Sequence, residues 1–244
     1  MADVQSVFKR YEKKYLLDAV QYQKLIKVIN EHMKPDKYGR HTICNIYFDT
    51  PDFRLIRTSI EKPVYKEKLR LRSYGIPNED STVFVEIKKK YDGIVYKRRI
   101  TMSLRDAYRY LFNGIRAPEN SQIKREIDYF ISYYRPIPKI YIAYDRVAYF
   151  CEEDPNFRIT FDSDIRYRDS DLYLEHGDYG ENLLDGEYHL MELKIAGTIP
   201  LWLTHALSEF KIYPPSFSKY GNIYKKEFCE KQAAKLEQKQ YMAE

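Results

Sequence analysis

Cations and apolar residues alternate along several short segments of this chain, and residues 68–72, Lys-Leu-Arg-Leu-Arg, are the clearest case. Successive side chains of a β-strand point to opposite faces of a sheet, so this segment predicts a strand with cations on one face and leucines on the other. The same sorting recurs in five further segments, at 85–88, 97–99, 143–147, 158–162 and 192–195. We therefore predict a sheet whose apolar face packs under helices and whose charged face points to an interior.

A solvated sheet face is the ordinary explanation of this pattern in any one strand, because antiparallel sheets commonly expose one face to water. Six strands with the same sorting weaken that explanation. Cations brought together inside a barrel repel one another unless an anion neutralises them, so a polyanion is the expected guest. Arginine matches phosphate oxygens with a planar fork and lysine adds a movable point charge, which suits several successive phosphates.

Turn residues divide the sequence into β-branched or aromatic runs of strand length. The expected strands cover 8–17, 43–49, 64–74, 82–90, 95–102, 140–150, 157–167 and 188–195. Asp92-Gly93 is a hairpin turn that tolerates positive φ. We predict an α+β fold, mainly β, in which an antiparallel eight-stranded sheet forms a closed or nearly closed β-barrel tunnel with peripheral helices.

Helix signals lie between these strands. Asp18 is a cap for a helix that Pro35 closes, Ser103 opens a short helix ended by Gly114, and further helices are expected at 119–134 and 200–210. A polar terminal helix begins at Asn222 and either plugs one tunnel mouth or packs outside, which is the commoner arrangement. Since the sequence contains no repeat or break in composition, we expect a single domain over residues 1–244.

The charge balance excludes some partners. The 244 residues contain 41 Lys and Arg against 36 Asp and Glu, a net charge of +5, so a basic surface for nucleic acid is not indicated. Three cysteines without metal-ligand spacing are typical of reduced thiols and favour the cytoplasm. No stretch approaches the roughly 18 apolar residues of a membrane span, so we expect no direct insertion, although a membrane-protein partner stays open.

Acidic residues share the charged faces. Glu12, Glu86 and Glu192 fall beside Lys14, Lys88 and Lys194, and hard carboxylate oxygens among phosphate-binding cations are what Mg²⁺ or Mn²⁺ requires. The alternative is that each glutamate simply pairs with its lysine. Neither a P-loop nor a glycine-rich dinucleotide fingerprint is present, so side chains must hold the phosphates.

Nine short motifs, in order along nearly the whole chain, resemble the triphosphate tunnel metalloenzyme (CYTH-like) superfamily and, within it, the VTC (vacuolar transporter chaperone) branch of polyphosphate polymerases. They are residues 10–15, 47–50, 68–72, 85–88, 97–99, 144–146, 158–162, 192–194 and 218–220. The wider superfamily usually begins with Glu-x-Glu-x-Lys, whereas this chain has Arg10, Glu12 and Lys14. That departure favours the polymerase branch over a two-metal hydrolase.

The resemblance implies roles for individual residues. Glu192, with Glu12 and Glu86, would hold Mn²⁺ or Mg²⁺. Tyr144 would contact a terminal phosphate. The nucleotide and the phosphate chain would be bound by two sets of cations: a catalytic set of Lys14, Arg70, Arg72, Lys88, Arg146 and Arg158, and a substrate-binding set of Arg10, Lys68, Lys97, Arg99, Lys194 and Lys219.

The resulting hypothesis is a metal-dependent polymerase that transfers the γ-phosphoryl group of ATP to phosphate or polyphosphate in the tunnel. An anionic phosphate acceptor needs no general base, and positioning with charge neutralisation supplies most of the rate. Two alternatives stay open. One is hydrolysis of triphosphates, with water positioned by Glu12, Glu86 or Asp162, and the other is a non-catalytic polyphosphate- or nucleotide-binding module.

Overall fold

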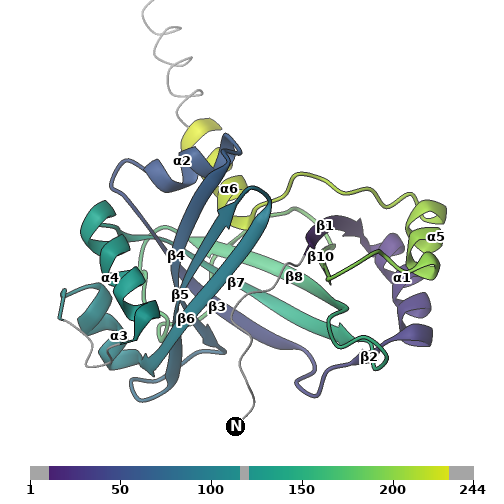
Figure 1. The fold of residues 1–244 in the computed structure, drawn as a ribbon, viewed down its shortest axis with the longest axis horizontal. Coiled ribbons are helices and arrows are strands. Elements are labelled where there is room, and N and C mark those ends of the chain that lie inside the picture. The colour runs from purple at the N-terminus through teal and green to yellow at the C-terminus, as the bar shows by residue number, and fades with distance from the viewer. Residues whose placement is uncertain (1–10, 116–120, 231–244) are drawn as a thin grey trace, which may run out of the picture.

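The computed structural model describes residues 11–115 and 121–230, arranged as in Figure 1. Within them, eight strands form the antiparallel sheet that the sequence predicts. The structure adds their order, β1-β10-β8-β7-β3-β4-β5-β6. Their bounds are β1 (Tyr11–Asp18), β3 (His41–Asp49), β4 (Tyr65–Tyr74), β5 (Thr82–Tyr91), β6 (Ile94–Ser103), β7 (Ile137–Phe150), β8 (Arg158–Arg168) and β10 (Tyr188–Ile195). Two additional two-residue strands, β2 (Lys34–Pro35) and β9 (Glu181–Asn182), pair with β7 and β8.

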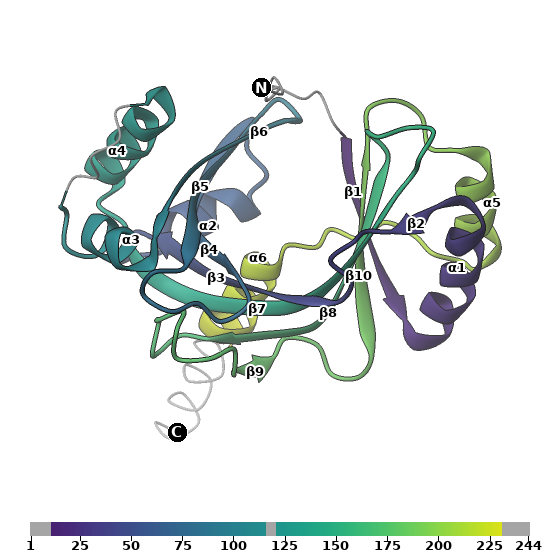
Figure 2. The same ribbon diagram turned by 90° about the horizontal axis from the view of Figure 1, so that it is seen from below.

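The sheet is strongly curved but stays open. In the described part of the chain, β1 and β6 are its two edges and do not pair with each other, so the tunnel architecture is present without full closure of the barrel. Figure 2 shows the two edges on either side of α6 (Lys219–Tyr224). The opening is bridged by an ion pair, because Lys88 Nζ on β5 lies 2.8 Å from Glu12 Oε2 on β1.

Helices cover the convex face in two groups. Around β3 to β6, α3 (Leu104–Leu111) and α4 (Gln122–Tyr134) pack on a core that includes the fully buried Leu69 and Leu71. Around β1, β10 and β8, α1 (Ala19–His32) and α5 (Leu201–Glu209) pack on a second core that includes Phe161 and Leu193. The predicted packing of the apolar strand faces under helices is confirmed.

Local signals place these elements well. Asp18 accepts the Gln21 backbone N–H and the Gln21 side chain returns to the Asp18 backbone, a capping box that begins α1. Asp92 and Gly93 both have positive φ, at 43° and 79°, as a two-residue hairpin turn requires.

Near Asp164, which has φ 47°, the register of β7 and β8 shifts. This bulge changes which β8 residues face inward, so that Asp162 and Ile165 share the concave face.

The C-terminal helix lies inside the curve of the sheet. Tyr220 and Ile223 of α6 are buried against Ile43, Ile142 and other residues of β3, β7 and β8, and a π-helix (Lys225–Glu230) follows. The expectation of outside packing for the helix from Asn222 is therefore wrong for residues 222–230. Its remainder, 231–244, lies outside the described residues.

A helix that the sequence did not predict supports α6. The helix α2 (Arg54–Ile60) begins after Phe53, whose side chain forms no cap. Instead the buried Asp49 accepts the backbone N–H groups of Leu55 and Ile56 and the hydroxyl of Tyr220. One carboxylate thus joins β3, the start of α2 and α6, and it fixes α6 against the sheet.

Candidate functional site: a charged concave face

The concave face carries two clusters, one built around the buried Glu86 and the other around the half-buried Glu192. The first belongs to β4, β5 and β6. Glu86, with a side chain only 1% exposed, lies 2.6 Å from Arg70 Nη2 and 2.9 Å from Lys97 Nζ. Arg72 Nε is 3.7 Å away and donates a hydrogen bond to Asn45 Oδ1 at 3.0 Å. These short contacts hold both arginines in fixed positions.

The second cluster joins β1, β10, β8, β7 and α6. Four cations surround Glu192 at longer range: Lys14 at 3.4 Å, Arg146 at 3.4 Å, Lys219 at 3.7 Å and Lys194 at 3.9 Å. Arg146 and Lys219 make their short contacts with the fully buried Asp162, at 2.6 Å and 2.5 Å. Asp162 therefore satisfies two of the cations, while Glu192 has only loose partners among the described residues.

Cations control the ionisation of the acids on this face. Burial raises the pKa of Glu12, Glu86, Asp162 and Glu192, but nearby lysines and arginines outweigh burial and hold each pKa below its ordinary value. Lys14, Lys219 and Arg146 hold the pKa of Glu192 well below its usual range. All four groups are carboxylates at neutral pH.

The lysines respond in opposite ways. Burial lowers the pKa of Lys14, Lys194 and Lys68, the last to about 8. Burial also lowers the pKa of Lys219, but Asp162 and Glu192 outweigh it and raise that pKa above its ordinary value. An anionic ligand would raise the pKa of the cations that lack a short acidic contact, so these cations would be stabilised by binding it.

Tyr47 joins the charged face from β3. Its hydroxyl accepts a hydrogen bond from Arg70 Nη1 at 3.0 Å, and its ring packs against Tyr220 of α6. Burial raises its pKa, but Arg70, Lys68 and Arg72 outweigh burial and lower the pKa to about 8. The alternation of charged residues does not identify Tyr47 and Asn45 as site residues because neither is charged, although strand alternation places both on this face.

The structure brings most of the predicted site residues together. Tyr144 lies beneath Lys219 and Arg146, with its ring centroid 4.3 Å from Lys219 Nζ, and its hydroxyl is 3.4 Å from Arg72 Nη2. The predicted residues on this face are Glu12, Lys14, Lys68, Arg70, Arg72, Glu86, Lys88, Lys97, Tyr144, Arg146, Glu192, Lys194 and Lys219.

Two of the predicted residues that the structure describes stand apart from the clusters. The side chain of Arg158 is 45% exposed, and its nearest acid, Asp36, is 4.0 Å away. Arg99 is exposed and covers the ring of Phe84 at 4.8 Å. Arg10 lies outside the described residues. Arg158 and Arg99 therefore belong to the margins of the face rather than to either cluster.

The acidic residues differ in how well they could coordinate a metal ion. No group of three or more His, Cys, Asp or Glu side chains in the described part of the chain could hold an ion by itself. Both oxygens of Glu86 are already within 2.9 Å of a cation, whereas no cation approaches Glu192 closer than 3.4 Å. Mg²⁺ typically takes one or two carboxylates and completes its shell with substrate phosphates. Glu192, with Glu12 nearby on β1, fits that arrangement.

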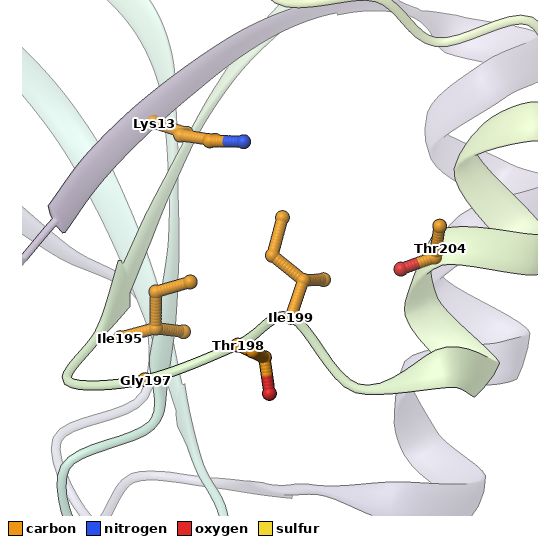
Figure 3. A pocket seen from close by; sticks show the side chains of 6 residues that line it. All are labelled: Lys13, Ile195, Gly197, Thr198, Ile199 and Thr204. Carbon is orange, nitrogen blue, oxygen red and sulfur yellow. The ribbon is translucent and has the colours of Figure 1, made fainter.

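A cavity of about 460 Å³ lies away from this face, between the ends of β1 and β10 and the helix α5. Figure 3 shows Lys13 and Thr204 pointing toward it. It is lined by Lys13, Ile195, Gly197, Thr198, Ile199 and Thr204. Lys13 alternates with Glu12 and Lys14, so it lies on the opposite face of β1 and the cavity is separate from the charged clusters.

No helix in the described part of the chain has the length and apolar character needed to cross a membrane.

The fold is shared with solved structures of low sequence identity. A proposed adenylate cyclase from Bacillus halodurans is 18% identical, with 91% of this chain and 100% of that chain covered and a TM-score of 0.54. A proposed adenylyl cyclase from Hippeastrum, whose dominant activity is triphosphatase, is 17% identical, with 86% and 93% covered and a TM-score of 0.53.

A search of curated proteins finds no match to this sequence. The family model of the VTC domain matches residues 9–228, a range that spans β1 through most of the terminal π-helix. It includes both glutamate clusters and the helix that carries Lys219. The chain therefore belongs to the VTC domain family, and its fold is that of the CYTH-like triphosphate tunnel proteins.

Proposed function

We propose that this protein is a polyphosphate polymerase, which transfers the γ-phosphoryl group of ATP to the end of a phosphate or polyphosphate chain. The bond between the γ-phosphorus and the bridging oxygen breaks, and its electron pair leaves with ADP. An oxygen of the acceptor's terminal phosphate forms the new bond, so the chain grows by one unit. Because the three cysteines are free thiols, a reducing cytoplasmic setting suits this activity.

The cations of the two clusters hold the reactants. Arg70, Arg72, Lys88 and Arg146 bind the triphosphate, with Arg158 at the margin. Lys219 and Lys14 face the acceptor and offset the charge of two anions brought together. Glu192, with Glu12, would hold Mn²⁺ or Mg²⁺, which when bound neutralises charge on the phosphate oxygens.

The ionisation of the carboxylates is the observation that favours phosphate over water as the acceptor. Water must lose a proton to attack phosphorus, and a general base works best when its pKa lies near the working pH. The pKa values of Glu12, Glu86, Asp162 and Glu192 are all held low, and each group lies within 4.0 Å of a cation. A phosphate acceptor is already anionic, so this site suits transfer to phosphate better than transfer to water.

Hydrolysis is the competing function, and the triphosphatase activity of the Hippeastrum protein is the observation that favours it. One assay separates the candidates: purified protein with ATP and Mn²⁺ or Mg²⁺, with ADP, free phosphate and acid-labile chains measured together. ADP with chains supports the polymerase. Free phosphate without chains would instead establish a hydrolase, and binding without turnover would establish a binding module.

A further inference from the structure

The margin of the concave face farthest from α6 carries a group of three aromatic side chains, His41, Tyr74 and Phe84, with Arg99 over one of them. We call these four residues the aromatic rim. The rings of Tyr74 and Phe84 meet edge to face with centroids 5.5 Å apart, and the ring of His41 lies 6.0 Å from Tyr74. Arg99 covers Phe84 at 4.8 Å. Tyr74 is 50% exposed, so much of its ring is available to a ligand.

Strand register places this rim directly beside the proposed triphosphate site. Phe84 is the cross-strand partner of Arg72, and His41 is the partner of Arg146. Tyr74 follows Arg72 by two residues on β4 and points to the same face, about 7 Å farther along the strand. Suppose that a triphosphate lies among Arg70, Arg72 and Arg146. The nucleoside attached to it would then have to span the distance from Arg72 to Tyr74 along β4.

At the opposite end of the face, the aromatic side chains that the structure describes are already packed on the C-terminal helical segment. There Tyr47 packs on Tyr220, and Phe53 packs on Tyr224 and Phe228 of the C-terminal helical segment. Lys68 at that end approaches Ser218, which caps α6. These rings are used in holding α6 to the sheet, whereas the ring of Tyr74 is half free. The two ends of the concave face therefore differ: one has an exposed aromatic ring, and at the other the rings pack on α6.

We propose that the aromatic rim binds the nucleoside of the nucleoside triphosphate, with the base stacked on Tyr74 and Phe84 and with Arg99 beside it. This inference rests on the proposed function, and it orients the triphosphate with its α-phosphate near Arg72 and its γ-phosphate toward Lys68 and Lys219. Stacking uses the flat face that every base possesses, so it discriminates little between bases. We therefore expect ATP, GTP and UTP to bind within a fewfold of one another.

Calorimetric titration of two ligands tests this assignment: a non-hydrolysable imido analogue of ATP, which has a nucleoside, and inorganic tripolyphosphate, which lacks one. Stacking on an aromatic side chain contributes enough that Tyr74→Ala should weaken binding of the ATP analogue about tenfold. Its affinity for tripolyphosphate should be unchanged, which also shows that the variant is folded. Phe84→Leu, which keeps an apolar side chain under Arg99, should give a smaller loss of the same kind.

Tyr129→Ala is the matched control, because Tyr129 is also an exposed tyrosine but lies on α4, on the convex side of the sheet. It should leave both affinities unchanged. Equal losses for both ligands in Tyr74→Ala, or no loss for either, would overturn the rim while leaving the phosphate site intact. If wild-type protein binds neither ligand, the proposed function and the rim both fail.

Discussion

The two glutamate clusters look alike in sequence but differ in geometry. Glu86 and Glu192 each occupy a strand position on the concave face, and each is followed two residues later by a lysine. Glu86 has arginine and lysine nitrogens at 2.6 and 2.9 Å, while the nearest cation to Glu192 is at 3.4 Å. Its side chain is also more accessible, at 14% against 1%. A closed ion-pair cluster and an open one thus face each other across the curved sheet.

This difference in geometry indicates different roles for the two glutamates. Glu86 fixes Arg70 and Arg72 and removes the repulsion between them, so it organises the cations that bind phosphate. Asp162 does the same for Arg146 and Lys219, which leaves Glu192 free to exchange its loose contacts for a metal ion. Substitution of the two glutamates should therefore affect different properties of the protein.

Glu86→Gln should have the largest effect, and the effect should be on stability. Removing one partner of a buried ion pair leaves uncompensated charges and typically costs about 3–5 kcal/mol of unfolding free energy. Glu192→Gln should cost less than half as much, because Arg146 and Lys219 keep Asp162. Urea unfolding followed by circular dichroism at pH 7 measures both values. Equal losses in the two variants would contradict the distinction between closed and open clusters.

Acid should erase the difference between wild type and Glu86→Gln. The folded pKa of Glu86 is lower than its unfolded value, so its contribution to stability is complete above the unfolded pKa, about 4.3 for glutamate. That contribution is lost as the pH falls toward the folded pKa. The two unfolding free energies should therefore begin to approach each other below about pH 4, and they should become equal only near the much lower folded pKa.

Glu192→Gln should produce the next largest effect, and this one should be on turnover. Loss of the residue that we assign to the metal should reduce chain synthesis by about 100-fold, in the range found when one electrostatic group is removed from an active site. Binding of tripolyphosphate without metal should be retained, since the cations remain. Asp36→Asn is a suitable control, because the Asp36 carboxylate contacts the marginal Arg158 and the Tyr38 backbone N–H rather than Glu192. Unchanged turnover in Glu192→Gln would remove Glu192 from the metal site.

Strand periodicity was sufficient to predict much of this fold. Lys68, Arg70 and Arg72 alternate with Leu69 and Leu71, and that alternation identified both faces of β4 without reference to the rest of the chain. The capping box at Asp18 and the turn at Asp92-Gly93 are equally local. By contrast, α2 depends on Asp49, which lies outside the helix and meets its backbone only after β3 is in place. No local signal marks such a cap.

The site was predicted less completely than the fold. Alternation shows that Glu86 and Glu192 share a face with lysines, but it gives neither the distances nor the number of cations around each acid. The loose shell of Glu192 depends on Asp162, which takes the short contacts of Arg146 and of Lys219 from a distant helix. Openness of the sheet between β1 and β6 is likewise a property of accumulated strand curvature rather than of any one segment.

The two clusters should also respond differently to alkali. Beside the Glu86 cluster, Lys68 and Tyr47 both have a pKa of about 8, and within it burial lowers the pKa of Lys97 to about 7. Between pH 7 and pH 9 the face therefore loses positive charge at the two lysines and gains negative charge at the tyrosine. Affinity for tripolyphosphate should therefore fall by roughly tenfold or more between pH 7 and pH 9. Tyr47→Phe keeps the ring against Tyr220 but cannot ionise, so it should remove one part of this dependence. Titration calorimetry at several pH values measures both slopes.

A matched variant assigns the remaining slope. Lys68→Met removes a second titrating group and leaves Lys97 as the third. Its affinity should be lower at pH 7 but vary less with pH than that of wild type. If neither Tyr47→Phe nor Lys68→Met changes the slope, the alkaline response belongs to other groups. In that case the pair would have no part in phosphate binding.

The smallest effect should come from the margin of the face. Arg158 and Lys194 are cross-strand partners on β8 and β10, but the Arg158 side chain is 45% exposed and that of Lys194 is 25% exposed beside Glu192. Exposed charge pairs contribute about 0.2–1 kcal/mol, so Arg158→Ala should weaken tripolyphosphate binding only about two- to fivefold. Lys194→Ala should weaken it more, because its charge acts in a less hydrated position. The reverse order would mean that the phosphate chain runs along the margin, and that the buried clusters support it from beneath rather than contact it.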